Sequence, residues 1–147
     1  MKLSTKGRYG LRAMIDLAQY SGDAPVSITS ISARQDISER YLEQLVALLK
    51  KAGLVRSIRG AGGGYVLAKD MKEISVGDVL RALEGSLEPV ECAGLDPAGG
   101  CKSADSCVSK YVWKRINESI SRTVDEIMLD QLVEESRKKT EAKEKHG

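Results

Sequence analysis

Apolar residues recur at helical spacing near the start of the chain. They are Leu11, Met14, Ile15 and Ala18, which stand at positions i, i+3, i+4 and i+7. This period predicts an amphipathic helix over about residues 5–21. Gly22 is expected to end the helix, and Pro25 lies in the connection that follows.

Two serines are expected to start the next two helices. Ser27 can cap a short helix whose inner face carries Ile28 and Ile31. A tight turn at residues 36–37 follows, and Ser38 can then cap a third helix.

The third helix separates apolar from polar positions clearly. Its apolar stripe consists of Leu42, Leu45, Val46 and Leu49, and its opposite face carries Arg40, Glu43, Gln44, Ala47 and Lys51. A helix of this kind packs its stripe on a core and leaves its polar face exposed. Gly53 is expected to end it.

Two short apolar runs follow, at residues 54–58 and 65–67, with a glycine-rich stretch at 60–64 between them. This pattern predicts a β-hairpin with a flexible tip, flanked by Arg56 and Arg59.

The second half of the chain predicts a helix, a loop and a long helix. Ser75 and Asp78 form a capping-box pattern ahead of a fourth helix. Residues 85–106 are rich in Gly, Pro, Asp and Ser, and a loop of this length in a compact domain is usually functional. Residues from about 108 to 138 are expected to form one helix of roughly 45 Å, and the charged tail after it is expected to fray. The apolar stripe of the long helix consists of Val112, Ile116, Ile120, Val124 and Ile127.

Composition is that of an ordinary globular protein. Apolar residues make up 41% of the 147 positions and charged residues 30%, which favours one domain with an appended element that folds without disulfides or a metal. The opening residues lack the apolar region of a signal peptide, and no apolar run has the length of a membrane span. We therefore expect a cytoplasmic protein with reduced thiols and no membrane partner.

Charge is distributed unevenly along the chain. Residues 1–65 hold ten Lys and Arg against five Asp and Glu, a net charge of +5, whereas the remainder has a net charge of −3. A basic half beside an acidic half suggests a polyanionic partner, although charge alone does not separate this from chance.

The order of elements is that of a winged helix-turn-helix. We predict a mainly α fold with a small β-hairpin wing, in which residues 1–72 bind DNA. Residues 73–147 then hold the fourth helix, a cysteine loop at 85–107 and a long C-terminal dimerisation helix. The candidate DNA-binding residues are Lys6, Arg8, Ser38, Arg40, Tyr41, Glu43, Gln44, Lys51, Arg59 and Gly60.

The chemistry of these residues suits duplex DNA. Gln44 can pair with adenine and Arg40 with guanine in the major groove. Ser38 can donate to a phosphate at its helix N-terminus, and Arg59 can reach a narrow minor groove. Glu43 either accepts from a cytosine amino group, and so discriminates between sites, or is an ordinary surface acid.

One alternative explains the glycine-rich stretch differently. Such stretches also cradle phosphates in nucleotide-binding loops, but here no Lys-Ser or Lys-Thr follows and the spacing of a dinucleotide-binding fold is absent.

The three cysteines are an odd number within one short segment. Cys92, Cys101 and Cys107 have the spacing C-x8-C-x5-C. Thiolates are the preferred ligands of iron–sulfur clusters, so we predict a metal site. A cluster-free thiol redox switch, a zinc site and three ordinary cysteines remain as alternatives.

Three blocks of sequence resemble the Rrf-type winged-helix transcription regulators. They are residues 3–10 (LSTKGRYG), 37–45 (ISERYLEQL) and 59–65 (RGAGGGY), and the likeness extends to about Val133. The resemblance implies a homodimer whose long helix crosses its partner and whose third helix and wing read a nearly palindromic DNA site. It also implies that the three cysteines hold a labile 2Fe–2S cluster whose presence changes which DNA sites are bound.

The chain departs from this family at the fourth cluster ligand. The family has a His three residues after the third cysteine, where this chain has Lys110, and the only histidine, His146, lies near the C-terminus. Several groups remain candidates for the fourth ligand: Glu91, Asp105, Tyr111, Glu43 of the partner subunit, or an exogenous molecule.

The apolar stripe of the long helix also indicates a partner. An isolated helix must bury such a stripe, and a second subunit is the natural cover, although the helix can also pack back on its own domain. Rival functions are a nitric oxide or thiol redox-sensing repressor of the same family, a metal-free regulator of cysteine metabolism, and an iron–sulfur carrier. Because the chain has no catalytic His or paired acids, we do not expect an enzyme.

Overall fold

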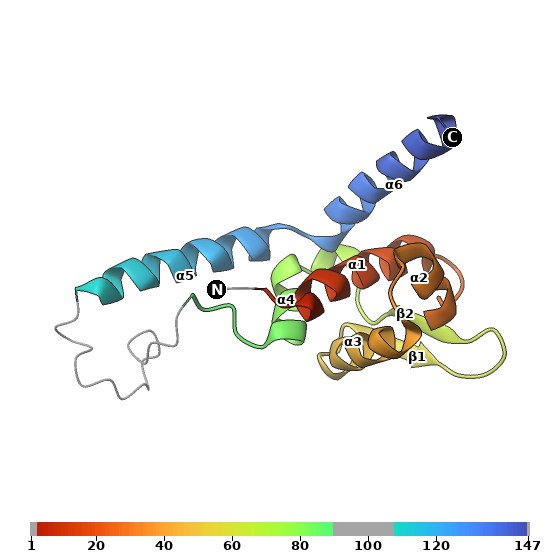
Figure 1. Cartoon of the computed structure of the whole chain (residues 1–147), viewed down its shortest axis with the longest axis horizontal. Helices are drawn as coiled ribbons and strands as arrows, with labels where there is room; N and C mark the ends of the chain where they lie inside the picture. The colour runs from red at the N-terminus through yellow and green to blue at the C-terminus, as the bar shows by residue number, and fades with distance from the viewer. Residues whose placement is uncertain (1–2, 90–107, 147) are drawn as a thin grey trace.

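The computed structural model describes residues 3–89 and 108–146 (Figure 1). The elements, in chain order, are α1 (Thr5–Tyr20), α2 (Ile28–Gln35), α3 (Glu39–Lys51), β1 (Val55–Ile58), β2 (Gly64–Leu67), the 3₁₀ turn η1 (Met71–Glu73), α4 (Val76–Glu84), α5 (Ser109–Glu126) and α6 (Leu129–His146). The mainly helical fold with one hairpin is therefore as predicted.

Serine side chains cap the first four helices. Ser27 and Ser38 accept from backbone N–H groups in the first turns of α2 and α3, as predicted. Ser75 and Asp78 form the predicted capping box of α4. Ser4 caps α1 in the same way, accepting from the Lys6 N–H at 3.1 Å. The turn between α2 and α3 places Asp36 in the left-handed region, with φ 54°, which a short polar side chain tolerates.

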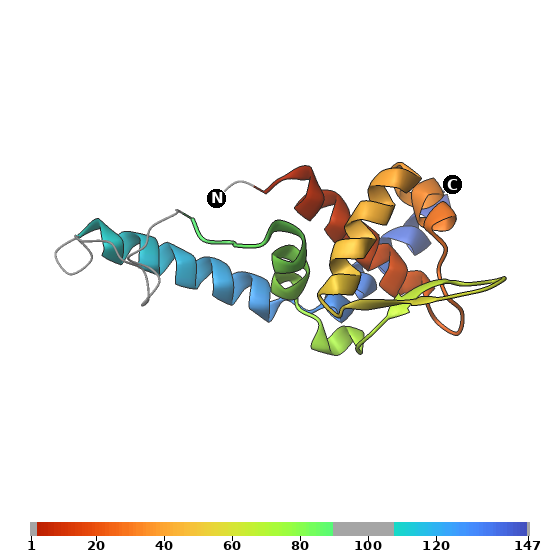
Figure 2. The ribbon, with the colours of Figure 1, turned by 90° about the horizontal axis from the view of Figure 1, so that it is seen from below.

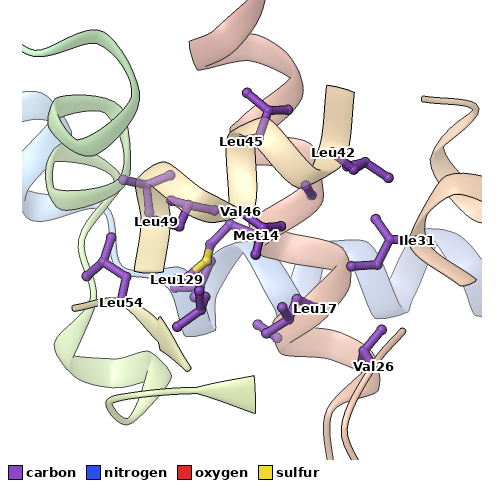
Figure 3. Packing of buried hydrophobic residues seen from close by; sticks show 14 of the residues in the cluster. Met14, Leu17, Val26, Ile31, Leu42, Leu45, Val46, Leu49, Leu54 and Leu129 are labelled. Carbon is purple, nitrogen blue, oxygen red and sulfur yellow. The ribbon is translucent and has the colours of Figure 1, made fainter. Parts of the chain in front are cut away.

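The core lies where α1, α3 and α6 meet (Figure 3). Met14 and Leu17 of α1 are buried against the α3 stripe of Leu42, Leu45, Val46 and Leu49. That stripe is fully buried, as predicted. Leu129 and Val133 of α6 complete the same core, each 1% exposed. Burial of a Leu side chain contributes about 1.5–3 kcal/mol, so Leu129 holds α6 firmly to α1 and α3.

The hairpin has a third, short neighbour that the sequence did not reveal. β1 and β2 are antiparallel, with Val55 opposite Leu67 and Ile58 opposite Gly64. Val26, just before α2, forms an isolated bridge with Tyr65 through two backbone hydrogen bonds of 2.8 and 2.9 Å. This bridge fixes the hairpin to the helical part of the fold.

The prediction of one continuous helix from about 108 to 138 is wrong. α5 ends at Glu126, Ile127 is extended with ψ 114°, and α6 starts at Leu129. The break allows Met128 to form an isolated bridge with Ser75 at the start of α4. On either side of it, Ile127 O accepts from the Val76 N–H and the Leu129 N–H donates to Ile74 O, both at 2.8 Å. The chain turns there so that Leu129 enters the core. The prediction of a frayed tail is also wrong, since α6 is helical to His146.

The two C-terminal helices have different surroundings. α6 packs against α1, whereas α5 contacts α4 and extends away from the rest of the molecule (Figure 1). No helix in the described ranges is long and apolar enough to cross a membrane.

Candidate nucleic-acid interface

The polar face of α3 is open to solvent along its length. Its apolar stripe is turned into the core, so the opposite side chains are left exposed. These exposed residues are Arg40, Glu43, Gln44, Ala47 and Lys51. Arg40, Gln44, Ala47 and Lys51 follow one another at spacings of three and four and so share one face of the helix.

Tyr41 is only half-buried and is engaged inside the protein. Its hydroxyl lies 2.9 Å from the Thr5 hydroxyl of α1, and its ring meets the Tyr9 ring edge-on at 6.2 Å. Tyr41 therefore joins α3 to the start of α1, which was not expected of a residue predicted to be free to meet DNA.

The N-terminal turns of α1 lie beside α3 because of this contact. Lys6 and Arg8 are exposed there, and the Arg8 guanidinium lies 6.0 Å from the centre of the Tyr9 ring. Ser38 is exposed at the start of α3, where its hydroxyl accepts from the Tyr41 N–H at 3.2 Å. The structure thus brings these predicted residues to neighbouring helix starts.

The wing carries the remaining predicted residues. Arg59 and Gly60 are exposed in the connection between β1 and β2, which projects from the end of the molecule opposite α5 (Figure 2). Gly60 has φ 100°, a conformation that favours glycine. Lys50 Nζ donates to the Ser57 hydroxyl at 3.2 Å and ties α3 to β1.

An ion pair between a partly exposed arginine and a buried aspartate holds α1 and α2 together. Asp16, whose side chain is fully buried, accepts two bonds from Arg34 at 2.8 and 2.9 Å and one from Gln35 at 3.0 Å. The hydrogen bond to Asp16 raises the pKa of Arg34, whose guanidinium also lies 4.0 Å from the centre of the Tyr20 ring. Sequence reasoning missed this pair, although an aspartate within the apolar face of a helix was a visible signal.

A second unpredicted contact joins the end of α4 to the start of α1. Glu84 Oε1 accepts from the Ser4 hydroxyl at 2.6 Å, the Ser4 N–H at 3.0 Å and the Gly7 N–H at 2.8 Å. The bond from the Ser4 hydroxyl lowers the pKa of Glu84 most, with help from the two N–H groups and the charge of Lys6, against the opposing effect of desolvation.

The polar face of α3, the start of α1 and the wing form one set of exposed basic and amide groups on a helical scaffold. The sequence profile of the Rrf2 family, described as an iron-dependent transcriptional regulator, matches residues 3–135. The chain belongs to the Rrf2 family. It is therefore similar over residues 3–135 to transcriptional regulators.

Curated relatives and solved structures agree with this Rrf2 assignment. The HTH-type transcriptional regulator IscR of Serratia proteamaculans (strain 568) is 45% identical over 133 residues, which cover 90% of this chain and 79% of that protein. The structure of IscR from T. potens is 46% identical with a TM-score of 0.73, and the match covers 92% of this chain and 88% of that one. The structure of CymR, the global cysteine regulator of B. subtilis, is 43% identical with a TM-score of 0.74, covering 91% and 97%.

The apolar stripe that was predicted to form the dimer contact lies in two different environments. Ile120, Val124 and Ile127 pack against a small cluster formed by Val76, Leu80 and Leu87 of the same chain. Val112 and Ile116, nearer the start of α5, stay 47% and 38% exposed, and Tyr111 and Val108 beside them are exposed as well. A salt bridge of 2.7 Å between Arg81 and Asp125 fixes α5 on α4.

The predicted cysteine ligands Cys92, Cys101 and Cys107 lie outside the described residues, as do Glu91 and Asp105. Lys110 is half-buried in the first turn of α5, and Tyr111 beside it is 63% exposed. Within residues 3–89 and 108–146, no three His, Cys, Asp or Glu side chains are grouped to hold a metal ion.

Proposed function

We propose that this Rrf2 regulator binds its operator as a homodimer, through the polar face of α3, the start of α1 and the wing. The observation that carries the proposal is the exposed face of α3 with Arg40, Gln44 and Lys51 on one stripe, beside a helix start and a hairpin with further basic residues. A helix of this kind fits the major groove, and two copies fit half-sites one helical turn apart.

Each group on this surface has a defined task. Gln44 and Arg40 read base edges. Glu43 selects between operators because a carboxylate can only accept a hydrogen bond, as from the amino group of cytosine. Lys51, Lys6 and Arg8 contact phosphates, as does Ser38, whose hydroxyl accepts from the protein and still has a proton to donate. Tyr41 orients the start of α1 through Thr5, and Arg59 with Gly60 enters the minor groove.

The exposed end of α5 provides the dimer contact. Val112 and Ile116 are large apolar side chains in contact with solvent, and covering them with the same residues of a second copy removes that surface from water. The proposed interface is therefore the first half of the predicted stripe, while Ile120, Val124 and Ile127 lie between α4 and α5.

We further propose that Cys92, Cys101 and Cys107 hold an iron–sulfur cluster of the 2Fe–2S type. Three thiols in one short segment supply most of the donors for such a cluster. Because a 2Fe–2S cluster takes four ligands and the chain has three cysteines, the fourth ligand comes from another group. The description of the family as iron-dependent and the IscR name of the relatives support this proposal. The cluster would bind reversibly, so its presence on the protein would report the supply of iron–sulfur clusters in the cytoplasm.

The effect of the cluster on DNA binding is limited by the thermodynamic linkage between the two binding events. The cluster shifts DNA preference only by the difference in its affinity for the two DNA-bound forms, typically ~1–3 kcal/mol. This difference in affinity would act through the DNA face, by which we mean the polar face of α3, the start of α1 and the wing. Glu43 is its selective residue. Control of iron–sulfur cluster assembly genes is the regulatory output that fits such a sensor.

Gln44→Ala tests the DNA face directly. We expect the variant to lose preference at one base pair in each half-site, with a change of about 1–3 kcal/mol there, measured by competition gel shifts on duplexes from the upstream region of its own gene. Gln131→Ala is the control, since Gln131 is an exposed glutamine on α6 whose side chain accepts from the Met128 N–H of its own chain segment at 3.1 Å. Identical site preferences for the two variants would rule out base reading by α3.

Iron analysis tests the cluster. Protein purified without air should be coloured and contain about two iron and two sulfide per chain, and the triple Cys→Ala variant should be colourless. The thiol or nitric oxide sensor is not favoured by the relatives named IscR. Colourless wild-type protein whose DNA binding still responds to oxidants would instead support the thiol switch.

A further inference from the structure

Glu84 caps a helix to which it does not belong. The first turn of α1 contains no acidic residue, and a helix N-terminus carries unpaired N–H groups and a partial positive charge. One oxygen of Glu84, from the last residue of α4, supplies the missing acceptor to Ser4 and Gly7. In a capping box the helix's own third residue does this; here the acceptor comes from 77 positions further along the chain.

The sequence of α1 is adapted to this contact. A Cβ at Gly7 would lie 2.7 Å from Glu84 Oε1, and a Cβ at Gly10 would overlap the Leu83 side chain. Glycine inside a helix is unfavourable by roughly 0.5–1 kcal/mol relative to Ala. Two glycines in α1 are therefore explained by the close approach of the end of α4.

The contact leads directly to the DNA face. Ser4 and Gly7 flank Lys6, and Thr5 between them binds Tyr41 of α3. Fixing Ser4 and Gly7 therefore fixes the turn that bears Lys6 and precedes Arg8, together with its link to α3. At its other end, Glu84 is the last residue of α4, the final helix before the part of the sequence with the cysteines.

We propose that Glu84 is a positioning residue for DNA binding, which holds the start of α1 in register with α3 and ties it to the end of α4. The inference rests on the proposed DNA face and adds to it a residue that contacts no DNA itself.

Gly7→Ala separates positioning from folding. The new methyl group meets the mobile end of the Glu84 side chain, which is expected to move away, and alanine favours the helix. We expect the melting temperature to stay the same or rise while affinity for the upstream duplex falls about fivefold. Gly22→Ala is the matched control, because a Cβ there meets nothing within 4 Å. Both variants are compared without bound cluster. Equal DNA affinities of Gly7→Ala and Gly22→Ala would overturn the proposal.

Two substitutions of Glu84 distinguish positioning from simple charge repulsion. Glu84→Gln keeps an acceptor oxygen, so its affinity is expected to stay within about twofold of wild type, whereas Glu84→Ala should weaken binding about fivefold. If the carboxylate only repelled DNA, both variants would bind more tightly and to the same extent, and the proposal would be wrong.

The DNA face has its own, separate test. If Gln44→Ala changes base preference but Gly7→Ala and Glu84→Ala bind like wild type, the positioning role alone is refuted. If Gln44→Ala is also without effect, the proposed DNA face is refuted first.

Discussion

At the level of single residues, burial could be predicted from the sequence, but contacts between helices could not. The buried and exposed sides of α3 were predictable, because a period of 3.6 residues assigns each position of a helix to a face. The partners of Glu84 and Asp16 were not, since Ser4 and Gly7 are some 80 positions from Glu84 and periodicity carries no information on which helices meet. Pairing of that kind depends on the packed arrangement of α1, α2 and α4.

Glu84 makes stability depend on pH in a defined direction. Its pKa is lower in the folded protein than in the unfolded chain, with the Ser4 hydroxyl as the main cause. Its contribution to stability is therefore complete above the unfolded value of about 4.3 and is lost as pH falls through the lower folded value.

We expect wild-type protein to lose more unfolding free energy than Glu84→Gln between pH 6 and pH 3, measured by urea titration. The comparison with Glu84→Gln removes the parallel contribution of Asp125, whose pKa Arg81 also lowers. Equal losses in the two proteins would show that the ionised carboxylate of Glu84 stabilises the fold no more than the protonated form does.

Elements were predicted well where local signals mark their ends. Serine caps and glycine stops placed α1, α2 and α3 within a residue or two. The break between α5 and α6 carries no such signal, since Ile127 continues the apolar spacing of α5. The chain leaves the helix there to pair with residues 74–76 and to bury Leu129, which is a tertiary effect.

The wing is the element whose contribution to DNA binding is most easily isolated. Arg59→Ala should weaken binding to any duplex and reduce the slope of log affinity against log salt by about 1, because one positive charge is removed from the minor groove. Arg56→Ala, an exposed arginine within β1 of the same hairpin, is the control. A slope for Arg59→Ala equal to the wild-type slope would exclude the tip from the interface.

At the scale of the whole molecule, α4 connects the two functions. It packs on α1 through Glu84 and Leu83 and on α5 through Val76 and Leu80. The DNA face and the proposed dimer helix are therefore attached to the same short helix, and a change on one side of α4 has a physical route to the other.

Dimer formation depends in this account on the exposed start of α5. Ile116→Glu places a charge within the proposed interface and should shift the protein to monomers at micromolar concentration, seen by sedimentation velocity. Lys114→Glu, at an exposed position on the opposite side of α5 from Ile116, should remain dimeric. If Ile116→Glu sediments as the wild type does, the subunits meet elsewhere.

The most direct test of the central claim compares operator choice with and without the cysteines. Wild-type protein purified and kept without air, and the variant with Cys92, Cys101 and Cys107 all changed to Ala, are each bound to the same pool of promoter duplexes at one salt concentration. We predict that both proteins bind DNA but select different sites. The same selected sites for the two proteins would contradict the claim that the cysteine segment controls how the DNA face reads its operator.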